Sequence, residues 1–223
     1  MVTAFAGVAA AATAGDITGK VKLTGTPPEE KTISLDAICG KLAPDGLKTR
    51  HYVKGADDGL GNVFVYLKSG AKPAPPTKEA PLLDQVHCEY VPYVMGVQTG
   101  QKFKIRNSDK VLHNVHSTPK NNKEFNFGQP VPGQVNEKSF DNAEVLVRFK
   151  CDVHPWMFAY VSVMEHPYFA VTDKDGNFKI EGVPAGDYVV EAVHLKAGKK
   201  EEKVTVGGDG KKVDFTLAVP PAQ

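Results

Sequence analysis

The residues best suited to chemistry lie in one short run, Cys151-Asp-Val-His154-Pro-Trp-Met157. This run places a thiolate, an imidazole and a thioether at the end of an expected strand. Soft sulfur ligands combined with imidazole favour copper, and two histidines, one cysteine and a long axial methionine form the blue-copper electron-transfer geometry. Such a site needs a second histidine from another part of the chain.

The second histidine is expected in the segment Leu112-His-Asn-Val-His116. Residues three apart in a strand point to opposite faces, so His113 and His116 cannot easily bind one metal. His113 shares the apolar face with Val115, where an unpaired imidazole is costly to bury. Cys151 is expected on the inward face of its own strand, so one metal between the strands would satisfy both side chains. We expect His116 behind the ligands or at the surface.

Together the two segments resemble the cupredoxins, and most closely the amicyanin-like members, which share the short Cys-x-x-His-x-x-Met spacing and a His-Asn-Val-His segment. The resemblance covers Val86 to Glu165 and implies a Greek-key β-sandwich with one type 1 copper near one end. The implied copper ligands are His113, Cys151, His154 and Met157. Asn114 would tie the two ligand loops together. The chain differs from that family in having Leu112 in place of proline and a longer polar stretch between the ligand segments.

The resemblance also implies where electrons would leave the site. In cupredoxins the edge of the corresponding histidine is exposed within an apolar patch. His154 is therefore the expected electron port, with Trp156 and Phe158 as patch residues. Both aromatic residues could instead be ordinary core residues. Zinc could occupy the same ligands, since cysteine and histidine bind it well.

The two other cysteines, Cys39 and Cys88, need a separate explanation. In an exported protein with three cysteines, two pair and one is left over. We expect a Cys39–Cys88 disulfide, whose closed loop of about 50 residues would stabilise the fold by on the order of 4 kcal/mol. The alternative is a second metal site that also uses His51 and His87, although this spacing matches no standard zinc signature.

Length and composition limit the remaining choices. The 223 residues fit one large or two small domains. The net charge of +1 argues against nucleic-acid binding, which needs a basic excess. No apolar run is long enough for a membrane span. Residues Met1 to Ala14 are apolar and end in Ala-Thr-Ala, which is typical of a signal-peptide remnant and predicts an exported or periplasmic protein.

Alternating apolar residues and frequent turns predict short strands and an all-β fold. Before His166 the strands are expected at Ile17–Leu23, Asn62–Leu67, Gln101–Asn107, Val111–Ser117, Val145–Cys151 and Tyr160–Met164. After it they are expected at Phe169–Thr172, Asn177–Glu181, Tyr188–His194, Lys203–Val206 and Val213–Leu217. Residues 33–42 could form a short helix or a loop, the proline-rich stretch 72–81 a stiff linker, and 120–142 a long polar connection.

The segment from Phe169 to Tyr188 resembles a carboxypeptidase regulatory-like domain, a transthyretin-type β-sandwich. This resemblance implies that residues 16–80 and 166–219 form one sandwich and that the cupredoxin, residues 81–165, is inserted in it or packed beside it. The alternative is two sequential domains. Asp173-Lys-Asp-Gly-Asn177 could be read as part of a calcium loop, but Pro184 stands where the required glutamate belongs, so a hairpin turn is expected.

These observations predict an exported type 1 copper protein that carries single electrons between redox proteins such as c-type cytochromes, and that is not itself an enzyme. One alternative is a copper-binding or copper-storage protein. Another is an electron-transfer subunit of a larger redox enzyme. No second copper cluster, nucleophilic triad or phosphate-binding loop is found in the sequence.

Overall fold

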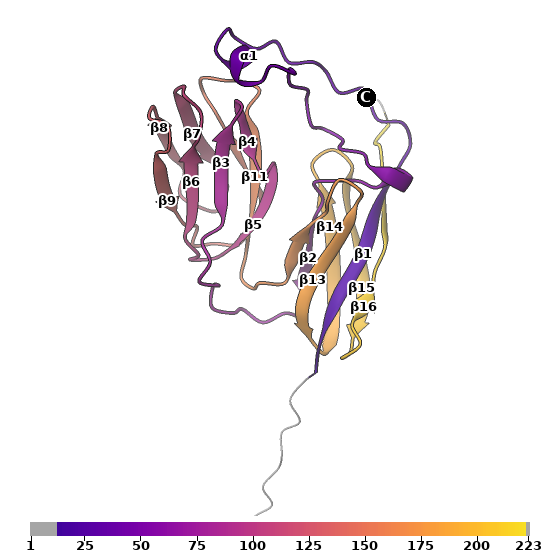
Figure 1. Cartoon of the computed structure of the whole chain (residues 1–223). Helices are drawn as coiled ribbons and strands as arrows, with labels where there is room; N and C mark the ends of the chain where they lie inside the picture. The colour runs from indigo at the N-terminus through magenta and orange to yellow at the C-terminus, as the bar shows by residue number, and fades with distance from the viewer. Residues whose placement is uncertain (1–12, 222–223) are drawn as a thin grey trace, which may run out of the picture.

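The computed structural model describes residues 13–221, and its regular structure is almost entirely β (Figure 1). The all-β prediction is therefore confirmed. The described residues contain two short helical segments, α1 (Cys39–Leu42) and η1 (Ala56–Asp58). The predicted signal-peptide remnant, residues 1–14, falls outside the described residues except for its last two positions. Within residues 13–221, no helix has the length and apolar character needed to cross a membrane.

The middle of the chain forms two sheets that share one apolar core, here called the first sandwich. Its five-stranded sheet has the order β5-β11-β10-β7-β8 and its four-stranded sheet the order β4-β3-β6-β9. Phe103, Tyr90 and Phe149 are among the fully buried side chains between the sheets. The strands are β3 (Leu82–Val86), β4 (Glu89–Val91), β5 (Val94–Gln98), β6 (Phe103–Asn107), β7 (His113–Thr118), β8 (Phe125–Gln129), β9 (Val135–Lys138), β10 (Glu144–Lys150) and β11 (Phe158–Met164).

The two ends of the chain form another pair of sheets, here called the second sandwich. One sheet has the order β13-β1-β16, with β17 also paired to β1, and the other has the order β12-β2-β14-β15. Ile17, Val190 and Phe215 lie in their shared core. The strands are β1 (Ala14–Thr24), β2 (Phe64–Ser69), β12 (Phe169–Val171), β13 (Asn177–Pro184), β14 (Gly186–His194), β15 (Gly198–Val206), β16 (Lys211–Lys212) and β17 (Phe215–Ala218).

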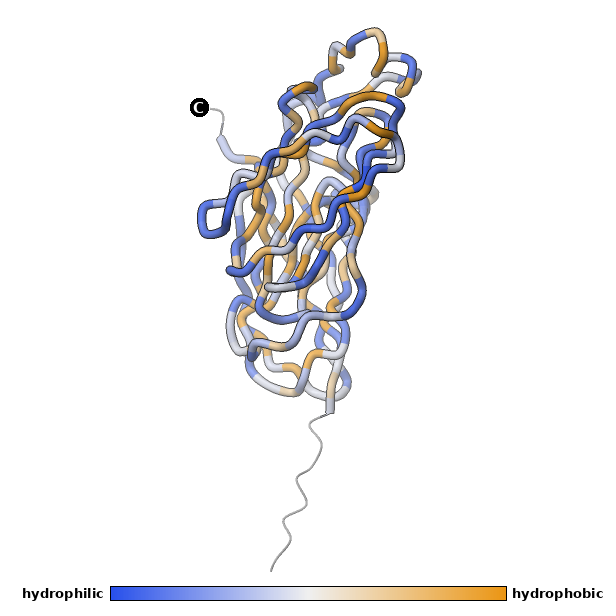
Figure 2. Tube along the Cα trace, turned by 90° about the vertical axis from the view of Figure 1, so that its left-hand side faces the viewer, coloured by the Kyte–Doolittle hydropathy of each residue, from blue (hydrophilic) through white to orange (hydrophobic). Residues whose placement is uncertain are grey.

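The two sandwiches lie side by side and pack through a small apolar cluster (Figure 1). Phe64 of β2 and Val94 of β5 are buried in it, and Phe169 packs against both sandwiches. In Figure 2 apolar and hydrophilic residues alternate along many strands, and hydrophilic stretches mark several of the outer loops. Every second residue of β6 and β7 is buried, so the alternation that predicted the strands corresponds to inward and outward faces.

Most expected strands are present, but the polar connection predicted at 120–142 is wrong. That stretch contains β8 and β9, which are the outer strands of the two sheets of the first sandwich. Both are short and polar on one face, because an outer strand is only partly covered and needs few apolar residues. The sequence analysis also missed β3, β4 and β5, which follow the proline-rich stretch.

The strand predicted at 145–151 is present, but it does not keep one inward face along its whole length. Val147, Phe149 and Cys151 point into the core of the first sandwich, and for Cys151 this is the predicted direction. Val145 instead packs against the cluster between the sandwiches. The reason is a register shift between Glu144 and Val147, where Leu146 has a φ of 56°. A bulge adds one residue to a strand and so moves the residues before it to the other face.

Close packing at the contact between the sandwiches makes Gly96 of β5 sensitive to substitution. A Cβ atom there would lie 2.4 Å from the Phe169 ring and 2.9 Å from the Phe64 ring. Phe64 is fully buried and Phe169 half-buried, and both rings would have to shift to admit the Cβ atom. We therefore expect Gly96→Ala to lower the free energy of unfolding by about 1–3 kcal/mol. Urea unfolding measures this. Gly128→Ala is the matched strand control, because its nearest neighbour would be 3.6 Å away. Equal stability of the two variants would contradict the packing described.

A buried histidine in the second sandwich predicts a pH dependence of stability. Burial lowers the pKa of His194 from its ordinary value of 6.5 to about 4. As the pH falls, the His194 imidazole is protonated in the unfolded chain before it is protonated in the folded chain. The stability that the neutral buried imidazole contributes is therefore complete above about pH 6.5 and is lost toward about pH 4. We expect the stability advantage of the wild type over His194→Asn to fall by about 2 kcal/mol between about pH 7 and about pH 5. Urea unfolding of both proteins at both pH values measures this difference in stability. A difference that does not change with pH would mean that the buried imidazole is not neutral.

Candidate metal centre

Two segments at one end of the first sandwich bring the predicted metal ligands together. His113 begins β7, and Cys151 follows the last residue of β10. The loop from Cys151 to Met157 is closed by two backbone hydrogen bonds: the Met157 N–H donates to the His154 carbonyl (3.0 Å) and the Cys151 N–H to the Met157 carbonyl (3.2 Å). These bonds turn His154 back toward the cysteine.

The donor atoms of three predicted ligands converge. His113 Nδ1 lies 3.1 Å from His154 Nδ1, and Cys151 Sγ lies 3.6 Å from the same His154 nitrogen. One ligand atom from each of the three residues lies within 4.8 Å of the other two. All three side chains are buried, and Met157 at the end of the loop is fully buried. The two imidazoles are packed edge to face.

Asn114 connects the two ligand segments. Its backbone N–H points at Cys151 Sγ (3.3 Å), and its side-chain oxygen accepts the Asp152 N–H (3.1 Å). The first contact supplies a donor to a thiolate, and the second fixes the start of the ligand loop. Asn114, which follows His113, therefore binds the segment that begins at Cys151, and Asp152, which follows Cys151, binds the segment of His113.

Asp109 holds His113 from behind. One oxygen of its carboxylate accepts the His87 N–H (2.8 Å), and the other accepts the Cys88 N–H (2.8 Å) and lies 2.8 Å from His113 Nε2. The Nε2 side of the ring faces this carboxylate, so the imidazole turns Nδ1 toward His154 and Cys151. Such carboxylate partners orient metal-bound histidines and raise their basicity.

Asp36 plays a similar part at His154, with a looser contact. Its Oδ2 lies 3.5 Å from His154 Nε2, while its Oδ1 accepts the N–H groups of Ile38 and Cys39 at the start of α1. In Figure 1 the segment that carries α1 leaves the second sandwich, crosses over the end of the first and returns. We call residues 33–51 the covering segment.

The covering segment buries His154, contrary to the prediction from the sequence. His154 was expected to expose its ring edge, but it is only 3% exposed. Asp36 and α1 lie over the side of the ring that faces away from Cys151. The resemblance to cupredoxins offered no counterpart for this segment, so its position could not be foreseen from that family.

The other two expected port residues lie beside the site and are half-buried. Trp156 packs against His154, with ring centroids 5.3 Å apart, and donates its Nε1–H to the Cys88 carbonyl (3.1 Å). Phe158 lies under the guanidinium of Arg148. Both residues line a cavity of about 260 Å³. Trp156 also packs against the core of the first sandwich, so it is a core residue as well as part of the cavity wall.

Cys39 and Cys88 form a disulfide, which confirms the predicted pairing. The alternative metal site built on these two cysteines is therefore wrong, because neither has a free thiol. The bond joins α1 of the covering segment to the turn between β3 and β4. It thus links the backbone that holds Asp36 to the backbone that holds Asp109, behind the two histidines.

The electrostatics of the site favour a thiolate. Burial raises the pKa of Cys151, but hydrogen bonds from His113 and the Asn114 N–H outweigh it and leave the pKa below its usual value. Burial lowers the pKa of His113, but its bonds with Asp109 and Cys151 produce a net rise. At His154 burial and the neighbouring His113 together lower the pKa. One imidazole is thus readily available as a neutral ligand.

His116 lies on the other side of β7, as the face argument predicted. Its Nδ1 lies 2.8 Å from Asp152 Oδ2 and its Nε2 lies 2.7 Å from Glu124 Oε1. Both ring nitrogens are therefore occupied at the surface. The structure brings the donor atoms of His113, Cys151 and His154 together, buries Met157 at the end of the same loop and leaves His116 outside the group.

The donor chemistry of the converging residues fits copper. Two imidazole nitrogens and one cysteine sulfur lie within 4.8 Å of one another, with a buried methionine on the same loop. Cysteine, histidine and methionine together suit copper better than calcium or magnesium, which bind oxygen. Zinc also binds cysteine and histidine, and the geometry alone does not distinguish it.

Comparisons with known proteins find solved structures of low similarity. No family model and no curated protein matches this sequence. Among solved structures, a purple cupredoxin from Nitrosopumilus maritimus is 24% identical, with a TM-score of 0.31, over 37% of this chain and 98% of its own. A Cu(I) amicyanin mutant is 21% identical, with a TM-score of 0.34, over 44% of this chain and 97% of its own. These TM-scores are low, so the likeness alone decides nothing about function.

A third similar structure matches this chain over only a small part of its own length. A copper-containing nitrite reductase from Thermus scotoductus is 18% identical, with a TM-score of 0.37, over 45% of this chain. The match covers only 25% of the reductase chain. Any activity of that whole protein therefore says nothing about this one.

Sequence reasoning missed the two carboxylates behind the histidines. Asp109 precedes His113 by four residues in a turn, and no periodicity marks it. Asp36 left a fainter signal: an aspartate shortly before a helix often accepts the first N–H groups of that helix, as it does here. That pattern predicts a helix start but not a contact with His154, which is distant in the sequence.

We expect Asp109→Asn to weaken metal binding roughly 10- to 100-fold, as loss of such a carboxylate partner does elsewhere. The reason is that an amide gives His113 no charged acceptor and cannot take the three donors that Asp109 now accepts. Titration against a copper chelator measures the affinity.

Asp84→Asn is the matched control for Asp109→Asn. Asp84 is a buried carboxylate near the same turn, but its partners are Arg106 and Ser108 rather than a histidine. Equal effects of both substitutions would mean that Asp109 acts only through general stability.

Proposed function

We propose that the chain is a type 1 copper protein that carries single electrons between redox partners. The observation that carries this proposal is the convergence of His113 Nδ1, His154 Nδ1 and Cys151 Sγ in a buried site. Copper bound there would supply a one-electron couple. Met157 would complete the ligand set, as in the cupredoxins that the two ligand segments resemble.

The protein's own residues would keep the site rigid. Asp109 and Asp36 fix the outer nitrogens of the two imidazoles, and Asn114 joins the two ligand segments. The disulfide joins α1, which Asp36 precedes, to the turn between β3 and β4 whose N–H groups bind Asp109. A site whose ligands cannot move needs little rearrangement when one electron enters or leaves. Burial excludes water and leaves no room for a substrate at the metal, which supports a carrier rather than an enzyme.

The proposal also covers the division of the chain into domains, its location and its partners. Residues 81–165 would be the cupredoxin domain, inserted in a transthyretin-like domain made of residues 16–80 and 166–219. The arrangement of the sheets supports this, since the first sandwich lies between two halves of the second along the chain. We further propose export to the periplasm, which a disulfide supports, and redox proteins such as c-type cytochromes as partners.

Spectroscopy of the copper-loaded protein tests the proposal directly. A copper–thiolate bond gives an intense visible charge-transfer band and a characteristic electron paramagnetic resonance spectrum. We expect both in the wild type and neither in Cys151→Ser. His116→Gln should keep the band, because His116 lies outside the site. A colourless wild-type protein after addition of Cu(II) would overturn the proposed function.

A further inference from the structure

The covering segment builds a cavity beside the candidate metal centre. The cavity has a volume of about 260 Å³ and lies between this segment and the loop that follows His154. Ile33 and Thr49 line it from the covering segment, and Trp156 and Phe158 from the ligand loop. The same segment that covers the edge of His154 thus leaves an opening at the neighbouring tryptophan.

Trp156 connects this cavity to the site. Its ring packs on His154 on one side and lines the cavity on the other. Its hydrogen bond to the Cys88 carbonyl fixes the ring in this position. A molecule in the cavity would therefore be separated from the candidate ligand His154 by one aromatic ring.

The walls of the cavity combine aromatic faces with polar groups. Tyr93, Trp156 and Phe158 supply the rings. Arg50 stacks over Tyr93, at 4.5 Å from the ring centroid, and pairs with Glu89 at 3.1 Å. Aromatic walls with a few placed polar groups are typical of small-molecule sites. The volume suits one aromatic ring better than a protein segment.

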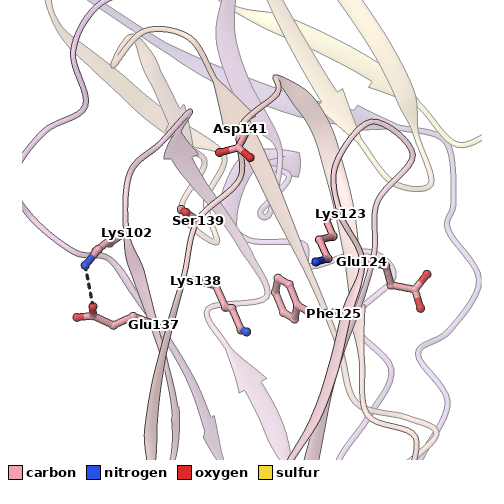
Figure 3. A pocket seen from close by; sticks show the side chains of 8 residues that line it. All are labelled: Lys102, Lys123, Glu124, Phe125, Glu137, Lys138, Ser139 and Asp141. Carbon is pink, nitrogen blue, oxygen red and sulfur yellow. Dashed lines mark ion pairs between the residues drawn. The ribbon is translucent and has the colours of Figure 1, made fainter.

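A larger depression on the first sandwich lacks these features. It has a volume of about 580 Å³ and is lined by charged residues of both signs around Phe125 (Figure 3). Lys102 is paired with Glu137 there, and the lining includes none of the candidate ligands. The smaller cavity is therefore the better candidate for a function linked to the metal centre.

We propose that the cavity beside Trp156 binds a small aromatic reductant with free hydroxyl groups, such as a hydroquinone, and that electrons enter the protein there. This proposal rests on the proposed copper function and names the electron donor of the same site. The ring would lie against Trp156 and Phe158, with a hydroxyl near Glu89.

The proposed step is balanced as a one-electron oxidation. One O–H bond of the hydroquinone would break, its proton would go to the Glu89 carboxylate and then to water, and its electron would pass to the copper(II) that His113, Cys151, His154 and Met157 would hold, giving copper(I). The phenoxyl radical leaves, and two such radicals disproportionate to one quinone and one hydroquinone. Two reduced proteins therefore result from each hydroquinone oxidised.

The first test follows the loss of the copper–thiolate colour after anaerobic mixing with hydroquinone. We expect the rate to saturate, with a half-saturating concentration on the order of millimolar, as fits so small a ligand. Hexaammineruthenium(II), a cation that Lys48 and Arg50 of the lining would repel and that has no aromatic ring to stack, should react without saturation. A rate that rises linearly with hydroquinone would overturn the proposal.

Filling the cavity provides the second test. Ile33→Trp places a large ring in it from the covering segment without changing Trp156. We expect the apparent second-order rate with hydroquinone to fall by about tenfold or more, and the rate with hexaammineruthenium(II) to stay the same. Val189→Trp is the matched control, since Val189 lines a separate cavity of the second sandwich. Equal hydroquinone rates in the two variants would contradict binding in this cavity.

A third measurement needs no copper. Trp156 is the only tryptophan of the chain, so its fluorescence reports on the cavity directly. We expect saturable quenching of the wild-type protein by phenol, excited where phenol does not absorb. Linear quenching would show that phenol does not bind there. If the colour is absent altogether, the proposed function fails, whereas a coloured protein with linear kinetics defeats only the hydroquinone site.

Discussion

The burial of two imidazoles and a thiol at one end of an apolar sandwich is the constraint on which this structure depends. An unpaired polar group in such a place is costly, so each needs a partner. His113 has Asp109, His154 has Asp36, and Cys151 has the Asn114 N–H. Asp109 itself is buried and is satisfied only because two successive N–H groups, of His87 and Cys88, point at it.

The disulfide extends this network beyond a single sandwich. Asp36 belongs to the long connection between β1 and β2 of the second sandwich, whereas Asp109 belongs to the first sandwich, between β6 and β7. The Cys39–Cys88 bond joins that connection to the turn between β3 and β4, whose N–H groups bind Asp109. The two parts of the chain therefore meet at two places: at the apolar cluster around Phe64 and at the metal centre. The covering segment contributes to the site as well as to stability.

The covering segment also changes which part of the site meets the outside. His154 lies under it, whereas Trp156 remains half-buried at the wall of a cavity. Tryptophan at this position both anchors the loop, through its hydrogen bond to Cys88, and forms the contact between His154 and the cavity. One residue thus couples the position of the ligand loop to the shape of the neighbouring opening.

The sequence by itself determined the ligand types, their spacing and the faces of most strands. Cys151, His154 and Met157 are close along the chain, and His113 is placed by the strict two-residue period of a strand, so local rules suffice for them. The tertiary structure alone decided the positions of Asp36 and Asp109, the covering of His154 and the inclusion of β8 and β9 in the sheets. These features depend on contacts between residues far apart in the chain, and the polarity of a segment does not reveal which distant groups will satisfy it.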